Sequence, residues 1–491
     1  MRLPLFKNSN NSIINIIYLY IYKIKEKELV LYNHQSIYLL FIKLYISFLI
    51  LFSFSKYNKY KELSKFNINK QYIKTQKYIN LTFHNYISDK VKINIAIYTH
   101  CIKNGGRARV TALFLQYLYK IKLFNIHLFT RRYKEDNEYF FPDNIKRIII
   151  KNDLIKAIKK NKIDILIYEL DEIKDILTLN NFSNIKVIFY HHSSTFDWLY
   201  ENYTIFKSIY KTFFNSKYVV SIVPFENDYL FKKWGIRSIL MNNFITYEFE
   251  SVIQTDLSSK IIIMLGRAIA KKKRFIIGMQ SMEYIIKEIP DCELKIISNL
   301  TGINNLQDFV NNLNLQKNIK FIGYFAAPDI FFRNASLCFF PSITEAFPMV
   351  LVETKIYGIP NILLGLDYIS IAKGGTIIIF DDTPESLAKK SIILLKNKKY
   401  KKFLSIEARK SMKQFNNDIL LIKWVKLILS IYNNDSYYIK LREEDIKINQ
   451  NEAIKIINNQ IKLLKMRDKN FYNISVKEYE NYTSMEKINL K

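Results

Sequence analysis

Residues 341–363 read PSITEAFPMVLVETKIYGIPNIL, and this stretch decides the fold class. The apolar run 337–340 before it is typical of a short buried strand. The periodic apolar residues from Val350 onward predict a helix, which Gly358 closes and Pro360 prevents from continuing. Because strand, loop and helix in this order form the repeating unit of parallel α/β sheets, we predict an α/β protein.

Two glutamates flank the predicted strand-to-helix turn. Ser342 and Thr344 are candidate helix caps, and Pro348 is tolerated in a first turn. Glu345 is therefore expected in the loop, and Glu353 on the helix, roughly 8–12 Å further along at about 1.5 Å per residue. Amides at the helix start can bind an anion between the two carboxylates. The layout suits a nucleotide-sugar, which has hydroxyls at both ends and phosphates in the middle, although two solvated glutamates would give the same spacing.

A second motif follows the apolar strand 260–265. Gly266 and Arg267 come first, and the basic run 271–274 then precedes a helical pattern over 275–289. Cations at the carboxyl end of a parallel strand, beside a glycine that lets the backbone approach closely, are well placed to bind phosphates. Arg267 is the strongest candidate, because its planar guanidinium can grip phosphate oxygens with two hydrogen bonds. A solvated basic turn is the alternative in a chain so rich in lysine.

These two motifs resemble those of the family 4 (group 1) retaining glycosyltransferases, which have the GT-B fold. The sequence GRAIAKKKRF is similar to that family's G-R-x4-K-(G/K) phosphate motif, with Arg267 and Lys272 at the matching positions. The sequence PSITEAFPMVLVE is similar to its P-S-x-x-E-(G/A)-F-x5-E block, with Glu345 and Glu353 as the two glutamates. The resemblance covers roughly residues 91–433 and is stronger in the C-terminal half.

The resemblance implies that a sugar passes from a nucleotide diphosphate sugar to a hydroxyl acceptor with retention of the anomeric configuration. Arg267 and Lys272 would neutralise the leaving diphosphate. Glu353 would hold the ribose hydroxyls, and Glu345 would orient the sugar. The remaining groups predicted to bind the donor are Gly266, Phe347, Met349 and Val350. No cofactor is expected, since the donor is a substrate, and no metal, since the chain lacks the strict Asp-x-Asp of the metal-dependent GT-A enzymes.

The N-terminal half carries a weaker form of the same pattern. A strand is predicted over 92–100, and Gly105 and Gly106 precede a helical run, so the backbone there could approach a phosphate or a sugar. An ordinary tight turn is the alternative. His191 and His192 follow the strand VIFY, where similar enzymes place a histidine near the transferred sugar; which one corresponds stays open, as does a purely structural loop role. Further strands are predicted at 125–129, 147–150, 163–168, 185–190, 218–223 and 238–241.

We therefore predict a GT-B architecture, with two Rossmann-like domains that face each other across a cleft. The chain has 491 residues, of which 49% are hydrophobic, enough for two cores. The predicted ranges are an N-terminal extension (1–90), an acceptor domain (91–245), a donor domain (246–417), a crossover helix (418–433) and a polar tail with a candidate helix (434–491).

The formal charge of +30 raises the question of a nucleic-acid partner. Lysine is spread over the whole chain, and neither a zinc finger nor an RNP-type aromatic strand motif is present, so we expect no nucleic acid. An anionic membrane surface is a better partner, at roughly 1 kcal/mol for each basic residue near the lipid. The three cysteines have no metal-ligand spacing, which favours a reducing cytosol over a disulfide framework.

The first 90 residues lie outside the resemblance. Residues 37–54 (IYLLFIKLYISFLILFSF) contain one charge and just reach the length of a membrane-spanning helix. Several lysines follow residues 37–54 in the sequence. The positive-inside rule therefore predicts a cytoplasmic enzyme attached to the membrane through this segment. An interfacial helix, a poorly ordered extension and a packed soluble helix are the alternatives.

The function predicted from the sequence is thus a metal-independent hexosyl- or related glycosyltransferase. Its partners would be a nucleotide-sugar donor and a glycan or lipid-linked acceptor. A catalytically inactive nucleotide-sugar-binding scaffold at a membrane is the main alternative, and an epimerase or a phosphorylase of related architecture is a third.

Overall fold

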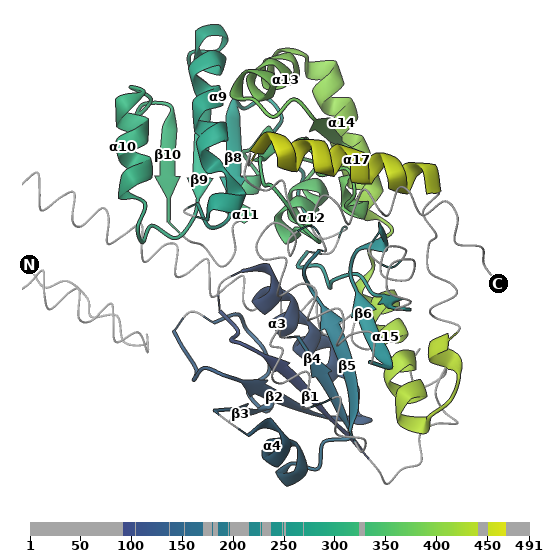
Figure 1. Cartoon of the computed structure of the whole chain (residues 1–491). Helices are drawn as coiled ribbons and strands as arrows, with labels where there is room; N and C mark the ends of the chain where they lie inside the picture. The colour runs from purple at the N-terminus through teal and green to yellow at the C-terminus, as the bar shows by residue number, and fades with distance from the viewer. Residues whose placement is uncertain are drawn as a thin grey trace, which may run out of the picture. The chain divides into compact units, whose positions relative to one another are not determined.

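The computed structural model describes residues 92–439 and 450–467, with gaps at 104, 137, 152, 170–178, 180–184, 195, 197–215, 226, 228–236, 248, 250–251, 269 and 324–328. Two parallel sheets account for the strands in these ranges (Figure 1). The sheet nearer the N-terminus, with the helices that cover it, is called the N-terminal lobe below. The second sheet and its helices form the C-terminal lobe.

The N-terminal lobe has seven described strands in the order β3-β2-β1-β4-β5-β6-β7, each parallel to its neighbours. The strands are β1 (Ile93–Thr99), β2 (Phe124–Thr130), β3 (Lys146–Ile149), β4 (Ile165–Tyr168), β5 (Lys186–His191), β6 (Tyr218–Ser221) and β7 (Ile239–Leu240). Helix α3 (Gly106–Tyr119) lies between β1 and β2 in the chain, and α4 (Leu154–Lys160) lies between β3 and β4. The six further strands predicted for this half are confirmed as β2 to β7.

The C-terminal lobe has six parallel strands in the order β10-β9-β8-β11-β12-β13 within the described ranges. They are β8 (Ile261–Leu265), β9 (Glu293–Ile297), β10 (Ile319–Ile322), β11 (Leu337–Phe340), β12 (Asn361–Leu364) and β13 (Thr376–Ile379). The helices are α9 (Phe275–Glu288), α10 (Asn304–Asn312), α11 (Asp329–Phe332), α12 (Met349–Ile356), α13 (Pro384–Lys396) and α14 (Lys398–Met412).

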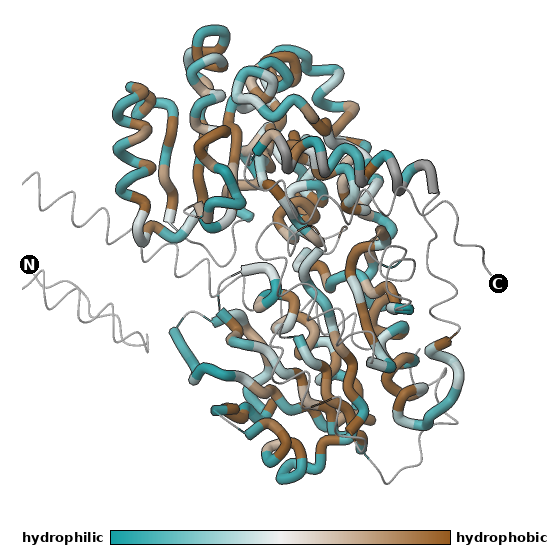
Figure 2. The backbone as a smooth tube through the Cα atoms, viewed as in Figure 1, coloured by the Kyte–Doolittle hydropathy of each residue, from teal (hydrophilic) through white to brown (hydrophobic). Residues whose placement is uncertain are grey.

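Burial explains why these segments are strands. The four residues of β4, β6, β11 and β12 are all buried, as expected for parallel strands covered by helices on both faces. Figure 2 shows mostly hydrophobic residues along the strands, whereas α10 is hydrophilic on one side. Its buried residues are Leu306 and Val310, four positions apart on one helical face. The core of each lobe therefore lies between its sheet and its helices.

Both sheets have a point where the strand order reverses. The N-terminal sheet grows in one direction from β1 to β3 and in the other from β4 onward, and the C-terminal sheet does the same about β8 and β11. Loops that follow the two strands at such a switch point leave in opposite directions and open a crevice at the carboxyl edge, where α/β proteins bind ligands. The loops after β8 and β11 carry the two sequence motifs that predict a donor site.

Helix α15 (Asn417–Asn433) follows the C-terminal lobe in the chain but packs on the N-terminal lobe. Its Trp424 is fully buried, with ring centroids 4.5 Å from Phe114 of α3 and 5.0 Å from Tyr190 of β5. Lys423 also donates a hydrogen bond of 2.7 Å to the Leu240 carbonyl. The residues predicted as a crossover helix thus contact the lobe to which they were predicted to return.

The predicted membrane segment 37–54, like the rest of the predicted extension 1–90, lies outside the described residues. Among the helices that are described, none has the length and the hydropathy needed for a membrane crossing. In the predicted C-terminal tail, the structure has one long helix, α17 (Gln450–Arg467).

Candidate active site

Helix α12 places the two predicted glutamates at different depths. It begins at Met349, directly after Pro348, and no side chain caps it, so the prediction that Ser342 or Thr344 caps this helix is wrong. The Ser342 hydroxyl donates instead to Glu345 Oε1 at 2.7 Å. Glu345 lies in the loop, as predicted, with 12% of its side chain exposed, and Glu353 lies on α12 and is fully buried.

An ion pair joins the two sequence motifs at the β8/β11 switch point. The ammonium group of Lys273 contacts Glu345 Oε1 and donates a hydrogen bond to it. The Ile343 amide, two residues before Glu345, donates to the Lys272 carbonyl at 2.8 Å. The basic turn after β8 and the glutamate loop after β11 are therefore connected through both side chains and backbone.

The lysine that reaches the glutamate differs from the one that matched the family motif. Residues Lys271–Lys273 form one turn of 3₁₀ helix, and Arg274 then adopts a left-handed conformation with φ of 45°. This conformation ends the turn at Lys273, and Arg274 then serves as the N-cap of α9. Lys272 is half-buried in the same turn, and no ion pair between it and Glu345 is present in the described structure.

Gly266 and Arg267 occupy the predicted strand end, but their environments differ. A Cβ added to Gly266 would lie 4.0 Å from Lys273 Cε, so this backbone lies beside the lysine stem. The Arg267 side chain is exposed and forms no hydrogen bond or ion pair with any described residue. An exposed guanidinium at this edge can approach a phosphate group from solvent.

Glu353 connects the two lobes. Its Oε1 accepts hydrogen bonds from Arg109 of α3 and, at 2.8 Å, from Thr246 in the segment between the lobes. Burial by itself lowers the pKa of Arg109. Glu353, together with Tyr139 and Tyr247, outweighs this effect, so the net pKa is raised and the arginine stays charged. Glu353 Oε2 is buried and has no hydrogen-bond partner among the described residues. One oxygen of this carboxylate therefore accepts no hydrogen bond within the described part of the chain.

The predicted glycine turn of the N-terminal lobe meets the start of α12. Gly105 has a φ of 99°, which favours glycine, and a Cβ on Gly106 would lie 3.8 Å from Met349 Cγ. The amides of Leu351 and Val352 donate to the Pro348 carbonyl. Those of Met349 and Val350 have no backbone acceptor in the part of the chain that is described, as expected for the first turn of a helix.

Two aromatic residues support the glutamate loop. The Tyr368 hydroxyl accepts a hydrogen bond of 2.8 Å from the Glu345 amide and donates one of 2.5 Å to the Glu345 carbonyl. The Phe196 ring of the N-terminal lobe packs against Tyr368, with 4.7 Å between ring centroids. Phe347, predicted to bind the donor, is buried and packs on Phe415 at 5.7 Å. Its side chain therefore has a packing role, and only its backbone could face a ligand.

The side chains of the two histidines at the end of β5 are almost fully covered. His192 Nε2 lies 3.4 Å from Glu169 Oε1, and its ring packs against Tyr190 with 4.0 Å between centroids. The Thr111 hydroxyl donates to the other Glu169 oxygen at 2.6 Å. His192 thus belongs to a buried cluster around Glu169, and the side chain of His191 is only 1% exposed. Neither histidine has a described contact with Glu345, Glu353 or Lys273.

Sequence reasoning missed Arg109 and Glu169, and it named Lys273 only as part of the basic run 271–274. Glu169 directly follows β4, which together with β1 forms the switch point of the N-terminal sheet. Its position as a charged residue directly after a predicted strand could have identified Glu169 as a candidate. Arg109 gives no such signal, because its partner Glu353 lies 244 residues away in sequence.

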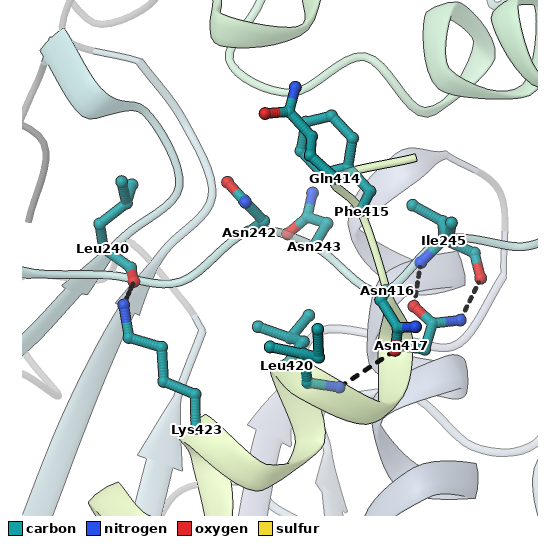
Figure 3. A pocket seen from close by; sticks show the side chains of 11 residues that line it. Leu240, Asn242, Asn243, Ile245, Gln414, Phe415, Asn416, Asn417, Leu420 and Lys423 are labelled. Carbon is teal, nitrogen blue, oxygen red and sulfur yellow. Dashed lines mark hydrogen bonds between the residues drawn. The ribbon is translucent and has the colours of Figure 1, made fainter. Parts of the chain in front are cut away.

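A pocket of about 220 Å³ lies elsewhere, where the chain passes between the lobes (Figure 3). Asn242 and Asn243 line it from the first crossing, and residues 414–417 line it from the second. Asn417 holds the crossings together, because its side chain bonds both the amide and the carbonyl of Ile245, at 2.8 and 2.9 Å. None of the predicted donor-site residues lines this pocket. Within the described chain, no group of three or more His, Cys, Asp or Glu residues could hold a metal ion.

Comparisons with known proteins match part of the chain to glycosyltransferases. Residues 248–411, which include β8 to β13 and α12, match the family model described as glycosyl transferases group 1. An uncharacterized glycosyltransferase of Haemophilus influenzae is 22% identical over 172 residues, which are 34% of this chain and 48% of the relative. The chain spans about half the length of the curated relatives it matches.

Solved structures of glycosyltransferases share the fold of both lobes. A sucrose-phosphate synthase from Thermosynechococcus elongatus superposes with a TM-score of 0.60 and 13% identity, over 70% of this chain and all of that one. HepE of Anabaena, solved with UDP and glucose, superposes with a TM-score of 0.57 and 12% identity, over 69% of this chain and 99% of that one. The described residues therefore have the GT-B fold, which confirms the predicted fold class.

Proposed function

We propose that this protein is a glycosyltransferase that moves a sugar from a nucleotide diphosphate sugar to a hydroxyl acceptor, with retention of configuration and without a metal. The observation that carries the proposal is the Lys273–Glu345 ion pair at the β8/β11 switch point. It brings a phosphate-binding cation and a sugar-binding acid together beside the open amides of α12. The match of residues 248–411 to the group 1 glycosyl transferases supports the same assignment.

The donor would bind along the start of α12. Lys273 and Arg267 would hold the diphosphate, with the amides of Met349 and Val350 as further donors. The free oxygen of Glu353 would accept a hydrogen bond from a ribose hydroxyl. Glu345 would leave its ion pair in part and orient the sugar. HepE, whose structure holds UDP and glucose, is a structural neighbour with these ligand classes.

The main requirement of the reaction is to stabilise the negative charge that develops on the leaving diphosphate. The bond between the anomeric carbon and the diphosphate oxygen breaks, the acceptor oxygen forms the new glycosidic bond on the same face, and the acceptor proton passes to the departing diphosphate. The sugar passes through an oxocarbenium-like state, so cations that stabilise the developing diphosphate charge lower the barrier. Lys273 is positioned for this role because its side chain is 21% exposed, and therefore accessible, at the site.

An acceptor-dependent release assay tests the proposal. The protein is incubated with a panel of UDP-, GDP- and ADP-sugars, with and without membrane extract as a source of acceptors, and free nucleoside diphosphate is measured. We expect Glu345→Gln to lower the acceptor-dependent release at least about 100-fold, on the scale of losing one electrostatic transition-state contact. The matched control is Glu288→Gln, since Glu288 is an exposed glutamate on α9. A chelator should leave the wild-type rate unchanged.

Three outcomes would count against the proposal. No release with any donor would reject transferase activity, and equal rates for both glutamate variants would reject the assigned site. Donor binding without acceptor-dependent release would favour the inactive scaffold instead. The identity of the acceptor, the cytoplasmic location and the attachment of residues 37–54 to a membrane stay predictions.

A further inference from the structure

Helix α17 lies against the C-terminal lobe at the carboxyl ends of three strands (Figure 1). Gln460 is fully buried and donates to Asp367 Oδ1 at 3.1 Å and to the Gly365 carbonyl. Gly365 has a φ of 68°, and a side chain there would collide with Leu463 of α17. The loop after β12 is thus shaped to receive this helix, although α17 lies outside the region that matches the family model.

Arg467, at the end of α17, contacts two loops and the end of strand β12. Its guanidinium donates to the Ile343 carbonyl after β11 at 2.8 Å and to the Leu364 carbonyl of β12 at 3.0 Å. It also forms two hydrogen bonds with the Asp382 carboxylate after β13, at 2.8 and 3.1 Å. Only 3% of the side chain is exposed. A planar fork of this kind fixes its acceptors in both distance and orientation.

Asp382 shares its carboxylate with a second arginine. Arg274, the residue after Lys273, donates to both Asp382 oxygens and, through Nε, to the Pro341 carbonyl at 2.7 Å. Burial alone raises the pKa of Asp382, but the hydrogen bonds from Arg274 and Arg467 hold it below the ordinary value, so the carboxylate stays charged. The two arginines therefore hold the glutamate loop at Pro341 and at Ile343.

We propose that Arg467 is a positioning residue, through which α17 clamps the basic turn with Lys273 and the loop with Glu345 in a fixed relative position. The clamp itself stands on the contacts above, and its role in donor binding rests on the proposed function. Groups that act on a transition state must be held to a fraction of an ångström, and a displacement of about 1 Å can cost about 100-fold in rate. The C-terminal helix would thus be part of the donor site.

The first readout of the test does not depend on activity. Hydrogen exchange is measured on peptides that cover 271–274 and 341–347 in the full chain, for wild type, Arg467→Ala and Met466→Ala. Met466 is the control, because it is half exposed on the same helical turn. We expect Arg467→Ala to speed exchange in both loops at least about tenfold, with strands β8 and β9 unchanged. Guanidinium ion, well below denaturing concentrations, should restore the protection in Arg467→Ala.

The second readout is kinetic. For Arg467→Ala, kcat/KM for the nucleotide-sugar should fall about 10- to 100-fold, with the acceptor KM unchanged, and guanidinium should recover part of the loss. Arg467→Lys, which keeps the charge but not the fork, should lie between the two. If Arg467→Ala fails to fold, Arg467→Lys provides the same comparison.

Unchanged exchange in the two loops would overturn the clamp. So would faster exchange that spreads to β8 and β9 and does not respond to guanidinium, because that pattern indicates general destabilisation. If the wild-type protein neither binds nor uses nucleotide-sugars, the proposed function is rejected. The hydrogen-exchange measurement would still show whether Arg467 holds the two loops.

Discussion

Lys273, and not the Lys272 that the family motif matches, forms the ion pair with Glu345. The spacing of the family motif selects Lys272, whereas the left-handed Arg274 ends the turn so that Lys273 faces Glu345. The sequence could not reveal this, because three successive lysines differ in direction only through the backbone angles of the turn. The glutamates themselves could be predicted, since a strand, a proline and a helix pattern locate them.

Replacing each lysine separately tests this assignment. Lys273→Ala should lower acceptor-dependent nucleotide release at least about 100-fold, because it removes a cation from the leaving diphosphate. Lys272→Ala should lower it less than about tenfold, since that side chain has no ion pair with Glu345 in the described structure. Initial rates at saturating donor provide the comparison. A larger loss of activity in Lys272→Ala than in Lys273→Ala would mean that the motif spacing, and not the ion pair with Glu345, identifies the functional lysine.

Lys355 is a buried cation on α12 that gives a pH-dependent stability. Its side chain is fully buried and donates to the Lys373 carbonyl at 2.7 Å and to the Ile371 carbonyl. Burial lowers the pKa of this ammonium group from 10.5 to about 7. Between these values the unfolded chain binds more protons than the folded chain, so stability should rise with pH over that window. Below about pH 7 Lys355 is protonated in both states, so the folded state is destabilised by the full free-energy cost of burying a charged ammonium group.

The prediction concerns how steeply the unfolding free energy changes with pH. From pH 7 to pH 9 the unfolding free energy of wild type should rise by about 2 kcal/mol relative to Lys355→Met, which has no group to titrate there. Urea unfolding at several pH values measures the difference. Lys410→Met, at a site where the side chain is 72% exposed, should keep the wild-type slope. Parallel curves for wild type and Lys355→Met would show that Lys355 does not titrate in this range.

At the scale of elements, the strands and the order of helices follow from the sequence because burial imposes a pattern. The apolar runs that precede Gly266 and Pro341 predict β8 and β11, and both are parallel strands at the switch point. The role of Arg467 does not follow in this way, because its partners Ile343, Leu364 and Asp382 are 85 to 124 residues away. Contacts of that separation depend on how whole elements pack, which local patterns do not encode.

Helix α15 should contribute strongly to the stability of the N-terminal lobe. Trp424→Ala removes a fully buried ring that packs on Phe114 and Tyr190, so it should cost about 4 kcal/mol. Ile419→Ala, on the same helix but at a side chain that is 67% exposed, should change stability by less than about 0.5 kcal/mol. Urea unfolding followed by circular dichroism gives the unfolding midpoint of each variant. Equal midpoints for the two would mean that α15 does not anchor on this lobe.

At the scale of the whole described molecule, two kinds of contact connect the lobes near the proposed donor site. Arg109 of α3 pairs with Glu353 of α12, and the Phe196 ring packs on Tyr368, which holds the Glu345 backbone. The backbone crossings at Ile245 and Asn417 join the lobes a second time. A ligand that binds Glu353 therefore acts on a residue that already bridges both lobes, which would couple donor binding to their relative position.

The binding of a nucleoside diphosphate tests the central claim most directly. Isothermal titration calorimetry of wild type with UDP, GDP and ADP should show saturable binding of at least one of them. Glu353→Gln keeps an oxygen for Arg109 but loses the charge that we propose binds the ribose hydroxyls. It should therefore bind that nucleotide at least about tenfold more weakly, or about 1.4 kcal/mol, while remaining folded by circular dichroism. Absence of binding heat for all three nucleotides, or equal affinity in wild type and Glu353→Gln, would contradict a donor site at the start of α12.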